Sequence, residues 1–393
     1  MVQPAERMEQ LPGYLFAEVD RKVREALGRG VDVIRLGIGD PDQPTPDYIV
    51  KKMQEETTKH RNHSYPPDDG LPEFKEAVAR YYRGRHGVSL DPEEEVAPLL
   101  GSKEGVAHIS ACYVNPGDVN LVPDPAYPVY GIGTMFAGGR AVTMPLREER
   151  GFFPDFSAIP GEDLKKAKLL FLNYPNNPTG AVATREFFGE AVAFAAEHGL
   201  IICHDAAYTE IGFDGEKPLS ILEAQGAKEV CIEFGSLSKP FNMTGWRLGY
   251  AVGQGDGVRL LQKYKSNIDS GIFKAIQYTG AEALVSPTTP GFLADLRAMY
   301  RGRRDVVVQG LRELGWELKP PRGTFYIWAP VPPGHTSASF ASEVLDKAGV
   351  VLTPGRGFGL YGEGYFRIAL TVGEDRLREA FQRLKEAGIS YRY

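Results

Sequence analysis

The chain has 393 residues, with 45 lysines and arginines against 51 aspartates and glutamates, which gives a formal charge of −6. Its hydrophobic fraction of 42% and charged fraction of 24% are those of an ordinary globular protein, and the length suffices for two or three structural units. A mildly acidic balance without a basic block argues against nucleic acid or an anionic membrane as the main partner.

The three cysteines, Cys112, Cys203 and Cys231, lie far apart and form no CxxC pair. This pattern excludes a disulfide scaffold and a cysteine-rich zinc site, and it is typical of a reducing compartment. No apolar run approaches the ~18 residues that span a bilayer, and the first residues contain no apolar signal segment. We therefore expect a cytoplasmic protein without membrane contact and without a metal site.

The first expected elements are a helix over residues 14–29, ended by Gly30, a β-like run over 31–40 and a helix over 71–86. Short apolar runs then alternate with helical stretches such as 184–198. Such alternation predicts an α/β fold, with a large domain built on a mainly parallel sheet flanked by helices. The runs expected to be strands are 96–100, 119–124, 168–175, 200–205, 229–235 and 248–253.

The pattern changes after about residue 285. A long helix over roughly 290–314 precedes four strand-like runs (WELKP, GTFYIWAP, GVVLTP and GYFRIAL) and a last helix from about Asp375. This order of helix-like and strand-like runs predicts a smaller α+β domain. The expected division is an N-terminal helix and arm that joins the small domain (1–45), a large domain (46–285) and the small C-terminal domain (286–393).

Loops that bind ligands in open α/β sheets lie beyond the carboxyl ends of the strands. GSKEG (Gly101–Gly105) follows the first strand of the sheet and precedes a helix, so its free backbone N–H groups suit a phosphate. The alternative interpretation is an ordinary helix start, with Ser102 as the N-cap and Glu104 in the first turn.

Two more polar groups follow strands. NYPNNPTG (Asn173–Gly180) forms a rigid turn whose asparagines can place amide groups at a ligand site. Asp205 ends a fully apolar strand, with Tyr208 three residues later, and a carboxylate there must be solvated, paired or hydrogen-bonded. It therefore either meets a ligand or caps a helix. His204 and Cys203 show no metal-ligand spacing and are interpreted as core or supporting residues.

The segment GSLSKPFNMTGWRLGYAVG groups Ser236, Ser238 and Lys239 after a strand and places Arg247 before the next one. Two hydroxyls and a guanidinium make a plausible phosphate cradle. A desolvated lysine in this position has the lowered pKa that Schiff-base chemistry requires, whereas an isolated lysine is normally a solvated surface residue.

One glycine motif has the wrong surroundings. Gly357–Gly362 spells GxGxxG, but a strand-like run follows it where a dinucleotide site needs a helix, so we interpret it as a glycine-rich turn. The sequence contains no GxxxxGK[ST], HExxH or GxSxG either, which weakens nucleotide triphosphatase, metalloprotease and hydrolase interpretations.

Taken together, NYPNNPTG, HDAAY, SLSK and GWRLG stand in the order seen in fold-type I pyridoxal-phosphate aminotransferases, and the chain resembles that family from about residue 36 to residue 370. The stretches LPGYLFAEVD, LGIGDPDQPTP, GSKEGVAHI, DPAYPVY, CHDAAYTEI, NMTGWR and KSNIDSG are most similar to the LL-diaminopimelate aminotransferase group. A small departure is Pro240-Phe241 after the lysine, where that group often has Thr-Tyr.

The resemblance implies pyridoxal 5′-phosphate as cofactor. Lys239 would bind it covalently and later act as the base at the substrate Cα. Asp205 would pair with the pyridine nitrogen, Tyr208 and Asn177 would hydrogen-bond the phenolic oxygen, and Tyr127 would stack on the ring. The phosphate would be held by Ser102, Lys103, Ser236, Ser238 and Arg247.

For the substrate, the resemblance implies that Arg367 grips the α-carboxylate, with Gly39 and Asn177 lining the same end. Tyr65 resembles a tyrosine that reaches the phosphate of the neighbouring subunit, which implies a homodimer with shared sites. Asp68 is a candidate partner for a distal ammonium. For Arg367, Tyr127, Tyr65 and Asp68, the alternatives are ordinary solvated or packed positions.

The implied reaction exchanges an amino group between LL-diaminopimelate, or tetrahydrodipicolinate, and 2-oxoglutarate or glutamate, in diaminopimelate and lysine biosynthesis. The alternatives are an aminotransferase of other specificity (for succinyl-diaminopimelate, aspartate, alanine or aromatic amino acids), a β-eliminating lyase, or a non-catalytic cofactor-binding module. Substrate choice depends on few loop side chains, so the sequence pattern fixes it poorly.

Overall fold

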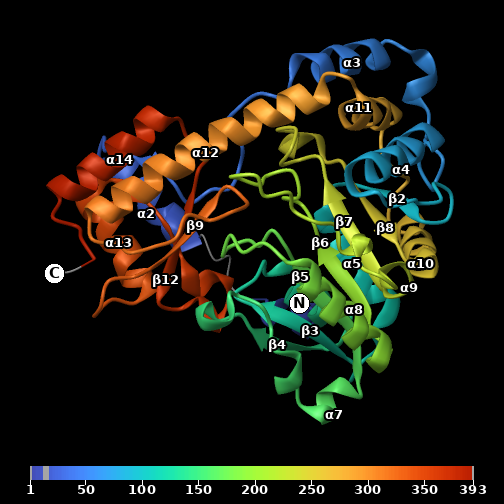
Figure 1. Ribbon diagram of the computed structural model, residues 1–393, viewed down its shortest axis with the longest axis horizontal. Helices are drawn as coiled ribbons and strands as arrows, with labels where there is room; N and C mark the ends of the chain where they lie inside the picture. Colours follow the sequence, from blue (N-terminus) through green and yellow to red (C-terminus); the bar gives the residue numbers. More distant parts are fainter. Residues whose placement is uncertain (1, 12–16, 392–393) are drawn as a thin grey trace.

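The computed structural model describes residues 2–11 and 17–391 of the chain. A seven-stranded sheet with the spatial order β2-β8-β7-β6-β5-β3-β4 forms its centre (Figure 1). The strands from β7 to β4 are all parallel, and β8 runs antiparallel to both of its neighbours. The strands are β2 (Val96–Leu99), β3 (Val119–Asp124), β4 (Arg140–Pro145), β5 (Ala167–Asn173), β6 (Ile201–Asp205), β7 (Cys231–Ser236) and β8 (Gly249–Gly253).

Both faces of this sheet are buried, which explains why its strands read as continuous apolar runs. Leu169 and Phe171 of β5 belong to one core and Leu170 and Leu172 to a second, since successive side chains of a strand point to opposite faces. The predicted α/β class is thereby confirmed. The helices of this part are α3 (Asp47–Thr57), α4 (Pro72–His86), α5 (Ser102–Tyr113), α6 (Val129–Phe136), α7 (Gly161–Leu164), α8 (Arg185–His198), α9 (Ala227–Val230), α10 (Gly255–Ser266) and α11 (Lys274–Val285).

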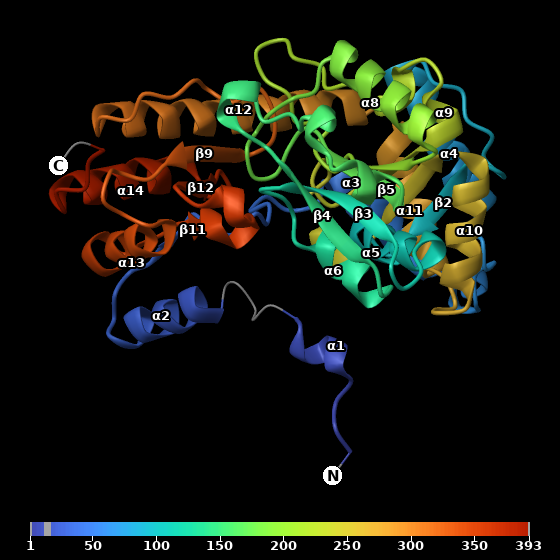
Figure 2. The same cartoon turned by 90° about the horizontal axis from the view of Figure 1, so that it is seen from below.

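A second group of strands lies at the far end of the long helix α12 (Thr289–Glu313), which crosses the view in Figure 1. Strand β12 pairs antiparallel with β11 and β9, and β1 pairs in parallel with β10. Figure 2 shows α2 beside α13 in the same part. The remaining elements are α1 (Glu6–Glu9), α2 (Ala17–Gly28), β1 (Ile34–Arg35), β9 (Tyr326–Pro330), α13 (Ser337–Ala348), β10 (Val350–Val351), β11 (Thr353–Pro354), β12 (Tyr365–Ala369) and α14 (Glu374–Glu386).

The pairing of β1 with β10 attaches the N-terminal segment to the C-terminal strands. It supports the proposed division into an N-terminal arm (1–45), a large domain (46–285) and a small domain (286–393), which stays a prediction. The first helix begins at Ala17 in the structure, and residues 14–16 of its predicted span lie outside the described residues.

The predicted strands of the central sheet agree with the observed ones to within two residues. The strand expected at WELKP is wrong. Its Trp316 is buried and donates its indole N–H to the carbonyl of Pro330 at 2.7 Å, so a side chain and not a backbone ladder fixes this segment beside β9. GVVLTP divides into β10 and β11, which belong to different sheets, and only Ile34–Arg35 of the run over 31–40 forms a strand.

The glycine motif Gly357–Gly362 forms two short 3-10 turns followed by strand β12, so the prediction of a turn is confirmed. The carboxylate of Asp124 accepts hydrogen bonds from the backbone N–H groups of Leu360 and Tyr361 at 2.9 and 3.0 Å. Gly359 lies directly against this carboxylate, which leaves no room for a Cβ. These glycines therefore serve the junction between β3 and the C-terminal strands.

The described residues contain no helix that is both long and apolar enough to cross a membrane. Within residues 2–11 and 17–391, no three or more His, Cys, Asp or Glu side chains are placed to hold a metal ion. The cysteines are free thiols, with Cys203 and Cys231 buried and Cys112 half-buried.

Candidate functional site

Asp205 lies at the carboxyl end of β6, among buried residues. Its Oδ2 accepts a hydrogen bond from the hydroxyl of Tyr130 on α6 at 2.9 Å, whereas its Oδ1 is buried with no partner among the described residues. Burial raises the pKa of Asp205 above its usual value, and the Tyr130 hydrogen bond opposes this change. A buried acceptor oxygen without a donor is rare in proteins, and it is suited to a cationic N–H of a ligand.

Lys239 follows β7 and donates its Nζ to the carbonyl of Gly39 at 2.7 Å. The same Nζ lies 5.7 Å from the centre of the Phe325 ring. Gly39 has no space for a Cβ, because the hydroxyl of Tyr326 occupies the position that a Cβ would take. The lysine is therefore held at the end of the N-terminal arm, among aromatic residues of the C-terminal part.

The first turn of α5 makes an open cradle. Its N-cap is Gly101, with φ +77° and no side-chain cap, so the interpretation of Ser102 as the N-cap is wrong. A Cβ on Gly249 would lie 2.6 Å from the backbone nitrogen of Ser102, and a Cβ on Gly101 would collide with the guanidinium of Arg247. Glycine at these positions lets a guanidinium and free N–H groups lie together, which is how proteins bind phosphate.

The two serines and Arg247 are fixed by local hydrogen bonds. Ser236 accepts a hydrogen bond from the backbone N–H of Ser238 at 3.2 Å, at the end of β7. Arg247 donates to the carbonyl of Thr244 at 2.9 Å and has φ +54°, a backbone conformation that is uncommon for residues other than glycine. The backbone thus holds this guanidinium against the start of α5.

Arg367 of β12 is buried, and burial lowers its pKa. It donates Nη1 to the Oδ1 of Asn177 at 2.7 Å and Nη2 to the carbonyl of Gly37 at 2.8 Å. The guanidinium carbon lies 4.1 Å from the ring centre of Tyr326 and 4.7 Å from that of Phe358. Its Nε is a buried donor without a partner among the described residues, so the group is oriented and still able to bind an anion.

Aromatic residues connect the two halves of the site. The hydroxyl of Tyr208 lies 3.1 Å from that of Tyr326, and burial raises the pKa of Tyr208 well above its usual value. Tyr127 packs edge-on against Tyr130, and the Nζ of Lys103 lies 5.8 Å from the centre of its ring. Tyr208, Phe325 and Tyr326 thus form one aromatic group beside the lysine and the arginine, and Tyr127 and Tyr130 form another beside the acid.

Within the described chain, two predicted site residues, Tyr65 and Asp68, do not lie beside the other predicted site residues. Tyr65 and Asp68 lie on the exposed loop before α4, and the side chain of Tyr65 is 83% exposed. Conversely, sequence analysis missed Tyr130, Tyr326 and Phe358. Tyr130 stands in the same DPAYPVY stretch as Tyr127, so its motif could have indicated it, whereas the other two carry no local signal.

The comparisons with known proteins agree with this geometry. A model of the family described as aminotransferase class I and II matches residues 31–384. The LL-diaminopimelate aminotransferase of Moorella thermoacetica is 57% identical over 98% of both chains. The solved structure of apo BacF from Bacillus subtilis has a TM-score of 0.95 at 40% identity, over 100% of both chains. A probable N-succinyldiaminopimelate aminotransferase from Thermus thermophilus has a TM-score of 0.89 at 40% identity, covering 95% of this chain and 100% of that one. The chain therefore belongs to the aminotransferase class I and II family.

Proposed function

We propose that this aminotransferase uses pyridoxal 5′-phosphate to exchange an amino group between LL-diaminopimelate, or tetrahydrodipicolinate, and 2-oxoglutarate or glutamate, in diaminopimelate and lysine biosynthesis. The substrate class, small amino and oxo acids, follows from the family. The choice of LL-diaminopimelate as the amino donor is supported by a relative named LL-diaminopimelate aminotransferase, which is 57% identical along nearly the whole chain.

The observation that carries the cofactor assignment is the unpaired Oδ1 of Asp205. A protonated pyridine nitrogen supplies the donor that this buried oxygen lacks. The open first turn of α5 and the arginine beside it fit a phosphate. In this proposal Tyr127 packs on the ring and Tyr208 and Asn177 serve the phenolic oxygen. Ser102, Lys103, Ser236, Ser238 and Arg247 hold the phosphate.

When bound, pyridoxal phosphate supplies an aldehyde that exchanges amino groups and a ring that accepts the electron pair released at the substrate Cα. Asp205 would keep a proton on the ring nitrogen, because a cationic N–H at its unpartnered Oδ1 would strongly stabilise the buried carboxylate. Lys239 Nζ would take the proton from the substrate Cα and deliver it to the cofactor within the same half-reaction, and it would carry a proton in the opposite direction in the second one. Its bond to the Gly39 carbonyl keeps it beside the substrate end of the site.

Arg367 and Asn177 orient the substrate. The guanidinium offers its free Nε and the remaining Nη protons to the α-carboxylate, while the bonds to Asn177 and Gly37 hold its plane fixed. Tyr326 and Phe358 cover the guanidinium and exclude water, which strengthens the ion pair with the carboxylate. One pair of residues thus serves both the amino acid and the 2-oxo acid, as an exchange reaction requires.

The proposal includes a homodimer with shared sites, in which Tyr65 of each subunit reaches the phosphate of the other. Tyr65 is largely exposed in the single chain, which is compatible with its burial between two subunits. Mixing Lys239→Ala chains with Tyr65→Ala chains tests this directly, since a mixed dimer regains one site in which both residues are intact. Activity that rises after mixing supports shared sites, and activity that stays at the level of the parents contradicts them.

A coupled assay with purified protein, pyridoxal phosphate and 2-oxoglutarate tests the reaction. We expect glutamate to form fastest from LL-diaminopimelate, compared with succinyl-diaminopimelate, aspartate and alanine. If another donor gives glutamate faster, the proposed substrate specificity is refuted and the transaminase activity still stands. Ammonia release without a 2-oxo acid identifies a lyase. Substituting Asp68 with Ala should raise the KM for LL-diaminopimelate alone if this carboxylate meets the distal ammonium.

Lys239→Ala separates a catalytic protein from a cofactor-binding module. The variant should lose turnover and still bind some cofactor through the phosphate cradle, which absorbance after gel filtration measures. Unchanged turnover would refute the mechanism.

A further inference from the structure

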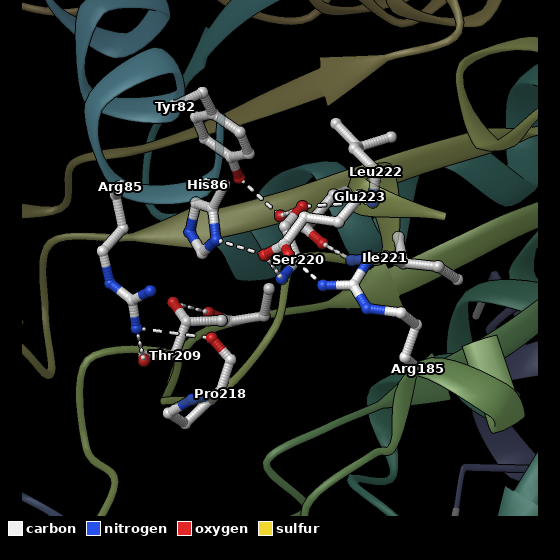
Figure 3. A network of polar contacts seen from close by, with 12 residues as sticks. Tyr82, Arg85, His86, Arg185, Thr209, Pro218, Ser220, Ile221, Leu222 and Glu223 are labelled. Carbon is white, nitrogen blue, oxygen red and sulfur yellow. Dashed lines mark hydrogen bonds and ion pairs between the residues drawn. The ribbon is translucent and has the colours of Figure 1, made fainter. Parts of the chain in front are cut away.

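Behind the candidate site, the carboxylate of Glu233 on β7 is completely buried and accepts four hydrogen bonds. Its Oε1 receives the hydroxyls of Tyr82 and Ser220 at 2.7 and 2.8 Å. Its Oε2 receives the backbone N–H of Ile221 and the Nδ1 of His204, both at 2.9 Å. Figure 3 shows Tyr82 of α4 pointing toward the segment that holds Ser220 and Ile221. Burial alone would raise the pKa of Glu233, but these bonds, led by that of His204, hold it below its usual value, so the group is an anion.

The two ring nitrogens of His204 have different partners. Nδ1 faces the carboxylate of Glu233, which only accepts, and therefore carries the ring proton. Nε2 accepts the backbone N–H of Tyr174 at 3.2 Å and therefore carries none. The imidazole is thus neutral, in the Nδ1–H tautomer, and it is completely buried. The mechanism described above does not use this histidine.

The acceptor nitrogen of His204 holds one end of the NYPNNP turn. Two neighbouring residues of β6 anchor that turn, since Asn173 donates its Nδ2 to the carbonyl of Asp205 at 2.7 Å and Tyr174 donates to His204. The turn then folds back, because the backbone N–H of Asn177 donates to the Oδ1 of Asn173 at 2.8 Å. Asn177 ends this path with its side chain on the guanidinium that we assign to the substrate carboxylate.

We propose that His204 is a positioning residue for this guanidinium. It acts through its hydrogen bonds to Glu233 and to the backbone N–H of Tyr174, through the peptide bond from Tyr174 to Asn173, and through the hydrogen bonds that join Asn173 to Asn177 and Asn177 to Arg367. Glu233 fixes the tautomer, and the tautomer decides whether the turn meets an acceptor or a second donor. The proposal rests on the proposed function only for the identity of the anion that Arg367 binds.

The tautomer can be observed without any variant and without activity. In the ¹⁵N-histidine-labelled wild-type protein, long-range proton–nitrogen correlations should assign His204 as Nδ1–H. In Glu233→Gln the amide oxygen must face the backbone N–H of Ile221 and therefore still accepts the Nδ1 proton, while the amide NH2 faces the hydroxyls of Tyr82 and Ser220. The Nδ1–H tautomer should therefore persist in this variant. A wild-type Nε2–H tautomer, or an imidazolium at pH 7.5, would overturn the proposal.

His204→Phe keeps the ring size and removes the acceptor, whereas His204→Gln keeps an acceptor within reach of Tyr174. We expect the KM for both the amino donor and the 2-oxo acid to rise about 10-fold in His204→Phe, equivalent to about 1.4 kcal/mol. The kcat should change less than about threefold, and His204→Gln should recover most of the KM. Amide hydrogen exchange of residues 173–177 should be faster in His204→Phe and near wild type in His204→Gln.

The matched control is His86→Phe. His86 also has a buried side chain, and its Nδ1 contacts a glutamate, Glu223, at 2.9 Å (Figure 3). Within the described part of the chain, it forms no hydrogen bond with residues 173–177. The His86→Phe variant should leave both KM values and the amide hydrogen exchange of residues 173–177 unchanged. Equal effects of His86→Phe and His204→Phe would reduce the role of His204 to general packing and overturn the proposal. If the wild type transaminates no donor while the tautomer and exchange results hold, the proposed function fails and the positioning chain stands.

Discussion

Removing the hydroxyl of Tyr130 should destabilise the cofactor-free protein in a pH-dependent way. Tyr130→Phe removes the hydroxyl that donates to the buried carboxylate of Asp205. A hydrogen bond to a charged group contributes about 1.5–3 kcal/mol. For 393 residues the unfolding entropy is about 0.8 kcal/mol/K, so this loss lowers Tm by about 2–4 °C at pH 7.5.

The sign of the pH dependence follows from the raised pKa of Asp205. Because the folded pKa lies above the unfolded value of about 4, the native state binds more protons in the window between them, and stability falls as pH rises through it. Tyr130→Phe raises the folded pKa further. The deficit of the variant should therefore be largest at pH 7.5 and shrink as the pH is lowered to 5, because protonation of the carboxyl removes the charge that the lost donor stabilised.

Calorimetry of the apo-protein at both pH values measures this difference. The matched control is Tyr278→Phe, which removes an exposed tyrosine hydroxyl 3.3 Å from Glu73 and should change stability by less than about 0.5 kcal/mol. Adding pyridoxal phosphate should narrow the gap between Tyr130→Phe and wild type, because the ligand supplies Asp205 with another donor. A Tyr130→Phe variant with wild-type Tm at pH 7.5, or with the same deficit at both pH values, would refute the reasoning.

Three further results are expected. Gly249→Ala places a Cβ 2.6 Å from the nitrogen of Ser102 and should raise the Kd for pyridoxal phosphate at least about 10-fold, measured by absorbance titration of the apo-protein, with retained fold by circular dichroism. Burial raises the pKa of Cys112 to about 12 and leaves the other two thiols enclosed, so Ellman's reagent at pH 8 should label the native protein far more slowly than the three thiols of the urea-unfolded chain. Arg303→Leu breaks a bidentate pair with Asp42, at 2.7 and 2.8 Å, and should cost about 3 kcal/mol, seen as a fall in Tm of about 4 °C; an unchanged Tm would show that the pair is not stabilising.

Much of the central sheet was predictable, because its strands are buried on both faces and their apolar runs are bounded by polar turns. The C-terminal strands were harder. WELKP has the composition of a strand, yet it joins no sheet, and the indole hydrogen bond of Trp316 to Pro330 fixes it beside β9. Backbone pairing depends on a neighbouring edge that no local pattern encodes.

The site shows the same contrast. Lys239 and Asp205 stand at strand ends within recognisable motifs, so their neighbourhood could be expected from sequence. Tyr326 could not, since its hydroxyl meets Tyr208 from a strand more than a hundred residues away. The N-cap interpretation of Ser102 failed because a left-handed Gly101 takes that position, a backbone choice that depends on the guanidinium packed against it.

The pairing of β1 with β10 sets an order of events during synthesis. Ile34 leaves the ribosome early but pairs with Val350, and at about 5–20 residues per second its partner follows about 15–60 s later. The strands of the central sheet, residues 96–253, are all translated in the meantime. The arm that carries Gly37 and Gly39 to the lysine and the arginine is consequently placed late. A nascent chain interrupted before residue 350 would hold a formed sheet and an unfinished site.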